Sequence, residues 1–141
     1  MIRFMGSARS TSTSELDRAG RQLLGSFYRG AYAAGAEPLP DGTQHVVIVN
    51  ESSAPPGTHW LCLYREPSDT HPLGEQLLYD SFARLPSTQW QPRLQGTETT
   101  ERDAEQAPTY DGGAATEYCG QACIAWACVA KGYGWNVARL V

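Results

Sequence analysis

The sequence lacks an apolar run long enough to cross a membrane as a helix. Residues 1–12 contain no apolar segment of the kind that a signal peptide needs, so we expect a disordered start and not a secreted protein. A strongly basic stripe is also missing, since 11 Lys and Arg stand against 15 Asp and Glu and the net charge is −4. Nucleic acid is therefore not evident as a partner, and neither is a membrane.

Cysteines are few, and their spacing is not that of a zinc or redox motif. The four are Cys62, Cys119, Cys123 and Cys128. On a helix we expect the last three to point in different directions, so that they do not converge on one metal ion. We therefore predict no metal and no cofactor. Reduced thiols are typical of a cytosolic or nuclear setting.

The order of apolar and polar segments predicts one α+β domain over residues 13–141. A helix is expected from Glu15, capped by Thr13 or Ser14 and fraying near Gly25. The runs 45–50, 60–64 and 76–82 predict three strands in an antiparallel meander, whereas 84–113 is polar and without clear structure. A second helix is expected over 118–131, capped by Thr116 and ended by Gly132 and Gly134. We thus predict a central, mainly antiparallel sheet packed against this helix, with the first helix alongside.

Cys119 is a candidate nucleophile because it falls in the first turn of the predicted second helix. Backbone N–H groups and the helix dipole stabilise a thiolate at such a position. Gly120 follows and leaves room for a substrate backbone to approach. Cys123 and Cys128 lie deeper in the helix and are typical of small core residues. The alternative for Cys119 itself is the same structural role.

His59 is a candidate base at the junction of a Pro-Pro-Gly turn and the second predicted strand. His45 and His71 fit a surface loop better. Asp80 lies inside the apolar stretch LLYDSF, where a carboxylate needs a partner, and orienting His59 would supply one. Alternatively, Asp80 begins a turn with Ser81. Trp60 either limits the rotation of the histidine or only fills the core.

The order His, Asp, Cys makes the chain resemble the adenovirus-type cysteine proteases and the related SUMO-processing proteases. The segment 57–60 resembles their G-x-H-W motif, 78–82 their acid-bearing strand, and 118–121 their C-G nucleophile motif. The upstream residues 28–30 and 38–40, followed by the strand at 46–50, resemble protease-like proteins of DNA viruses and virus-like transposons. The resemblance extends from about residue 27 to residue 133.

This resemblance implies an adenovirus-type protease fold and a cysteine endopeptidase with His59, Asp80 and Cys119 as its triad. Its substrates would be viral capsid or core precursors cleaved at small or glycine-containing sites. The location would be the host nucleus or cytoplasm, or the virion. Whether the protein needs an activating partner stays open. The alternatives are a protease for ubiquitin-like proteins, or a catalytically inactive relative that acts as a binding or virion-assembly module.

Two departures from the family pattern bear on activity. The family carries a glutamine six or seven residues before the nucleophile as an oxyanion donor, whereas this chain has Gly113 and Gly112 there. The nearest upstream glutamine, Gln106, lies thirteen residues before Cys119. Either Gln106 still reaches the site or backbone N–H groups serve alone. The chain also stops soon after the second helix, so we expect it to be compact, incomplete or dependent on a partner.

Overall fold

The computed structural model describes residues 12–33, 35–50, 59–71, 74–81, 98–99 and 119–140. The predicted disordered start lies outside these residues, apart from Ser12. So do Thr116 and all of the polar segment 84–113 except residues 98 and 99. None of the described helices is long and apolar enough to cross a membrane.

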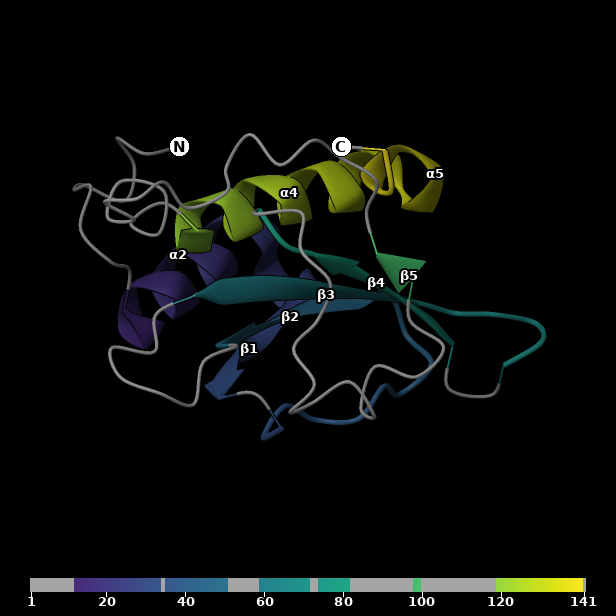
Figure 1. The fold of residues 1–141 in the computed structure, drawn as a ribbon, viewed down its shortest axis with the longest axis horizontal. Coiled ribbons are helices and arrows are strands. Elements are labelled where there is room, and N and C mark those ends of the chain that lie inside the picture. Colours follow the sequence, from purple (N-terminus) through teal and green to yellow (C-terminus); the bar gives the residue numbers. More distant parts are fainter. Residues whose placement is uncertain are drawn as a thin grey trace, which may run out of the picture.

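Five strands form one sheet in the order β1-β2-β3-β4-β5 (Figure 1). The predicted meander is confirmed, because β3 pairs antiparallel with both β2 and β4. The two outer strands pair in parallel, β1 with β2 and β5 with β4, so the sheet is mixed, with its antiparallel pairs at the centre. The class is α+β. The strands are β1 (Tyr28–Ala33), β2 (His45–Asn50), β3 (Trp60–Glu66), β4 (Glu75–Tyr79) and β5 (Glu98–Thr99).

The first helix, α2 (Thr13–Leu24), begins two residues before the predicted start. Its N-cap is Ser12, not Thr13 or Ser14. The Ser12 side chain accepts the N–H of Glu15, and the Glu15 carboxylate accepts the N–H of Ser12. This reciprocal capping box satisfies two N–H groups that the helix itself leaves without partners. A single turn, η1 (Gly25–Phe27), then leads directly into β1.

The predicted C-terminal helix is α4 (Cys119–Tyr133). Gly132 lies inside it, and the break comes at Gly134, whose φ of 82° suits a residue without a side chain. A short helix, α5 (Trp135–Ala138), follows. Helices α4 and α5 lie over one face of the sheet, with α2 packed against β1 and α4 (Figure 1).

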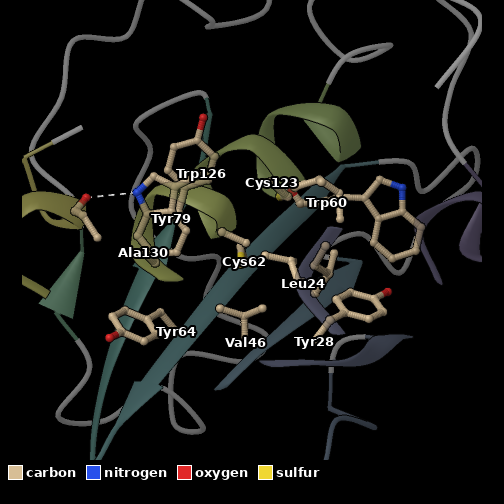
Figure 2. Packing of buried hydrophobic residues seen from close by; sticks show 14 of the residues in the cluster. Leu24, Tyr28, Val46, Trp60, Cys62, Tyr64, Tyr79, Cys123, Trp126 and Ala130 are labelled. Atoms are coloured by element: carbon tan, nitrogen blue, oxygen red, sulfur yellow. Dashed lines mark hydrogen bonds between the residues drawn. The ribbon is translucent and has the colours of Figure 1, made fainter. Parts of the chain in front are cut away.

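The strands bury side chains on both faces of the sheet, which explains their continuous apolar sequences. The face toward the helices carries a large cluster in which the ring of Tyr79 stacks on Trp126, with centroids 5.1 Å apart (Figure 2). The Trp126 indole N–H donates to the carbonyl of Ala138 and ties α5 to α4. The opposite face buries a second cluster almost completely: Val47, Val49, Leu61, Leu63 and Leu78.

Close contact between α2 and β1 requires a glycine in the middle of the helix. A Cβ atom at Gly20 would lie 2.6 Å from the ring of Tyr28, which is far inside van der Waals contact. The Tyr28 hydroxyl also donates to Asp17, 2.8 Å away, on the same helix. Burial and this carboxylate raise the pKa of Tyr28, so the phenol keeps its proton and remains a donor.

His45 is buried, which corrects the expectation that it belongs to a surface loop. Only 2% of the residue is exposed, at the start of β2. Its Nδ1 lies 3.0 Å from the carbonyl oxygen of Thr43, and the guanidinium of the buried Arg65 lies 3.4 Å from Nε2. Burial lowers the pKa of His45, and the charges of Arg65 and Arg29 act in the same direction. Folding therefore favours the neutral form of His45.

A lowered pKa at His45 predicts a loss of stability in acid. Below pH 6.5 the unfolded chain binds a proton at this residue that the folded chain rejects, so stability falls as the pH drops below 6.5. In His45→Gln, which can still accept from Arg65 but cannot titrate, this part of the pH dependence should disappear. Urea unfolding at pH 7.0, 6.5, 6.0 and 5.5 measures it. His71→Gln, at an exposed position, should keep the wild-type dependence, and the same dependence in His45→Gln would contradict the assignment.

Candidate active site

Antiparallel pairing of β3 with β4 brings His59 and Asp80 together. The pairing begins at Cys62 opposite Tyr79, so the residues just before β3 lie beside those just after β4. The distance from His59 Nε2 to Asp80 Oδ1 is 2.6 Å, and both residues are buried. Asp80 thus follows β4 and is not inside a strand, which corrects the prediction of a strand over 76–82. It precedes a turn at Ser81 and still orients the histidine.

Cys119 is the first residue of α4 and lies against the start of β3. Its sulfur accepts the backbone N–H of Trp60 at 3.3 Å. The peptide that donates this N–H directly follows His59 in the chain. The N–H that bonds the sulfur and the imidazole of His59 thus belong to neighbouring residues.

His59 is held in a state that favours its protonated form. Burial alone lowers the pKa of His59. The side chains of Asp80 and Cys119 outweigh burial, both by hydrogen bonding and by their negative charge, and raise the pKa of His59 to about 9. The ring bonds Asp80 through Nε2, and the side chain of Cys119 acts on the same ring. An imidazole between a carboxylate and a sulfur can stabilise a thiolate as its ion-pair partner and can also deliver a proton.

Cys123 lies one helical turn after Cys119 and points to the same strand residue. Its sulfur donates to the carbonyl oxygen of Trp60 at 3.3 Å. The prediction that the helix cysteines point in different directions is therefore wrong for these two, since residues four apart share one face of a helix. Figure 2 shows Cys123 and Trp60 next to each other at one end of the buried cluster.

The predicted site residues are thus divided between those placed together and those not described. His59, Asp80, Cys119 and Trp60 meet at the junction of β3, β4 and α4, and Gly120 is buried in the first turn of α4. Gln106 lies outside the described residues, as do Gly57, Thr58, Phe82 and Tyr118 of the motifs. Cys123 belongs to the buried core, as predicted. Its four-residue spacing from Cys119 also places both thiols on one helix face.

An open hollow on the surface lies apart from this junction. It is lined by Leu24, Phe27, Arg29 and Lys131, among others. Lys131 is roughly 18 Å along α4 from Cys119, at 1.5 Å per helical residue, so the hollow is separate from the site. Within the described part of the chain, no group of three or more His, Cys, Asp or Glu side chains is arranged to hold a metal ion.

Comparison with known proteins assigns no family to this chain. No family model matches the chain, and no curated protein shows significant similarity to it.

The raised pKa of His59 predicts that its bond to Asp80 stabilises the fold in a defined pH range. Since the folded pKa lies above the unfolded value of 6.5, this stabilisation is fully present below pH 6.5 and is lost as the pH rises through about 9. The shift corresponds to about 3 kcal/mol for a group this buried. Asp80→Asn should therefore destabilise the protein most at pH 5.5–6.5 and least at pH 9.5.

Urea unfolding of the wild type and Asp80→Asn at these pH values measures the difference. His59→Gln, which carries no titrating ring, should lose the same pH dependence. A destabilisation by Asp80→Asn that is equal at pH 6 and pH 9.5 would show that Asp80 supports the fold without holding a charged histidine.

Proposed function

We propose that this protein is a cysteine endopeptidase in which Cys119 is the nucleophile, His59 the general acid and base, and Asp80 the residue that orients His59. The observation that carries the proposal is the position of the His59 ring, which Asp80 bonds at 2.6 Å through Nε2, beside a thiol that accepts the N–H of the next residue, Trp60. A nucleophile, a base and an orienting group at one junction form the arrangement that covalent catalysis requires.

The reaction follows from these contacts. The Cys119 thiolate attacks the carbonyl carbon of the scissile bond and forms a carbon–sulfur bond. As the tetrahedral intermediate collapses, the carbon–nitrogen bond breaks and protonated His59 gives its proton to the leaving amine. Water then attacks the carbonyl carbon of the thioester while His59 takes a proton from that water. The carbon–sulfur bond breaks, the Cys119 thiolate leaves, and the carboxylic acid product is released.

The start of α4 supplies donors for the oxyanion of this intermediate. The N–H groups of Cys119 and Gly120 lie in the first turn of α4, where the N–H groups point out of the start of the helix. They belong to the turn that holds the sulfur, and the helix dipole adds to their effect. This favours backbone donors over Gln106 in the role that the family gives to a glutamine.

The adenovirus-type protease fold and a virus-related role extend the same proposal. They are supported by the motif order His59, Asp80, Cys119 along the chain and by the helix that begins at the nucleophile and packs on the sheet. The proposed substrate is a polypeptide cleaved at small or glycine-containing sites, as in viral precursors. Ubiquitin-like proteins share the glycine-rich end, so a ubiquitin-like probe and a precursor-type peptide are assayed side by side.

A second candidate function is a catalytically inactive relative that serves as a binding module. The burial of Cys119 favours it, since only 2% of the residue is exposed. A peptide aldehyde ending in glycine distinguishes the two, because it forms a covalent adduct only with a competent thiol that substrate can reach. An adduct on Cys119 in the wild type supports the peptidase, and its absence in the folded protein supports the binding module.

Hydrolysis should depend on His59 and not on the other histidines. His59→Ala should lower kcat/KM by roughly 100- to 10,000-fold, the usual contribution of a general acid–base, and Cys119→Ala should abolish turnover. His71→Ala, at an exposed loop position, is the matched control and should retain the wild-type rate. Initial rates on a glycine-containing peptide, with circular dichroism to verify folding, measure these effects. An inactive His71→Ala would assign the base elsewhere.

Asp80→Asn should keep the geometry and reduce activity less than the corresponding change in a serine protease. An amide still accepts a hydrogen bond from the ring but cannot stabilise its positive charge. We expect a loss of roughly 10- to 100-fold in kcat/KM, against about 10,000-fold in the serine case, because a cysteine–histidine pair is already ionic at rest. Asp80→Ala should lose more, since the ring loses its acceptor. Wild-type rates in both variants would remove Asp80 from the mechanism.

A further inference from the structure

We propose that Cys123 is a positioning residue for Cys119, and that it acts through the backbone of Trp60. The inference rests on the proposed function and adds to it a residue that makes no contact with substrate. It would fix where the nucleophile stands relative to the base.

The thiols of Cys119 and Cys123, on one face of α4, bond the N–H and the carbonyl of the same residue, Trp60. Trp60 donates its N–H to Cys119 and accepts from the S–H of Cys123 at its carbonyl, both at 3.3 Å. The two cysteines are one turn apart on α4, so this pair of bonds sets both the height and the rotation of the first turn against β3. A single contact would leave the helix free to rotate about it.

The two bonds lie just past the end of the β3–β4 ladder. The last pair of that ladder at this end is Cys62 with Tyr79, two residues beyond Trp60. Trp60 itself pairs with Asn50 of β2, and the two sulfurs of α4 bond its N–H and its carbonyl. Helix α4 is thus tied to the backbone of β3 by two hydrogen bonds at one residue.

The chemistry of Cys123 suits a permanent donor. It is fully buried, and burial raises the pKa of its thiol well above the usual value, with the nearby Cys62 and Cys119 adding to the effect. A thiol that keeps its proton donates to a carbonyl, whereas a thiolate would repel it. The two cysteines thus play opposite parts on one residue: Cys119 accepts as the nucleophile, and Cys123 donates as the anchor.

Positioning matters here because the Cys119 sulfur has to satisfy two groups at once. It meets the His59 ring and the Trp60 N–H, which follow each other in the chain. Reactive groups generally need to be held within roughly 0.5 Å of their working geometry. Loss of the Cys123 anchor would let the first turn of α4 shift along β3, and the sulfur would lose the N–H or the imidazole.

The test compares Cys123→Ala with Cys123→Ser, which differ only in a hydroxyl that can donate to the Trp60 carbonyl. Cys128→Ala, a half-buried cysteine on the same helix, is the matched control. Two readouts are followed: the pH profile of kcat/KM on a glycine-containing peptide, and the rate at which limiting iodoacetamide alkylates Cys119, mapped by mass spectrometry. Should Cys123→Ala fail to fold, Cys123→Val, which fills the site without a donor, takes its place.

In Cys123→Ala we expect kcat to fall roughly 10-fold with KM nearly unchanged, as for one lost hydrogen bond. The acidic limb of the pH profile of kcat/KM should move to higher pH. The rate at which iodoacetamide alkylates Cys119 should also fall roughly 10-fold. Cys123→Ser should recover most of both, and Cys128→Ala should match the wild type.

Wild-type values in Cys123→Ala would overturn the proposal, as would equal losses in Cys123→Ala and Cys123→Ser, because then the donor would not matter. A fall in kcat without a shift in the pH profile would mean lost packing only and would also overturn it. If the wild type hydrolyses no peptide while alkylation of Cys119 still responds to Cys123, the peptidase proposal fails and the positioning role stands.

Discussion

The register of β3 against β4 is the constraint on which the site depends. Pairing Cys62 with Tyr79 sets His59 beside Asp80, and the same pairing ends two residues short of the start of β3. Just past that end, the sulfurs of α4 bond the backbone of Trp60. The register of β3 therefore sets the carboxylate–imidazole contact, and the same strand holds the start of the helix that carries the thiol.

Two buried histidines show how surroundings shift a pKa in opposite directions. The side chains of Asp80 and Cys119 raise the pKa of His59 despite burial. At His45, burial and the charge of Arg65 lower the pKa and outweigh the opposite effects of Thr43 and Asp41. Burial by itself does not decide protonation, because the partner that the adjacent strand supplies decides its sign.

Much of the framework could be predicted from sequence, because the apolar runs of β2 and β3 and the helical pattern of α4 are strong local signals. Strand β1 was missed. Its sequence YRGAYA is short and weakly apolar, and Gly30, at a φ of 113°, interrupts its register with β2. Its strand character comes from pairing with β2, which local sequence does not contain.

The site was predictable in its residue types and less so in its details. His59, Asp80 and Cys119 carry motif signals, and the structure places them together. The surroundings of His45 depend on Arg65 from the neighbouring strand, and the role proposed for Cys123 depends on its bond to Trp60 of β3. Both are products of tertiary pairing, which a helix or strand pattern alone does not encode.

The alternation of side chains along β3 has a consequence for how the protein folds. A slip of one residue between β3 and β4 would turn the side chains of β4 to the opposite faces of the sheet and carry Asp80 away from His59. A chain paired in the wrong register would then hold its thiol, imidazole and carboxylate apart. The thiol of such a misfolded molecule would be unreactive. The rate of alkylation at Cys119 would therefore measure how much of the protein has formed the correct strand pairing.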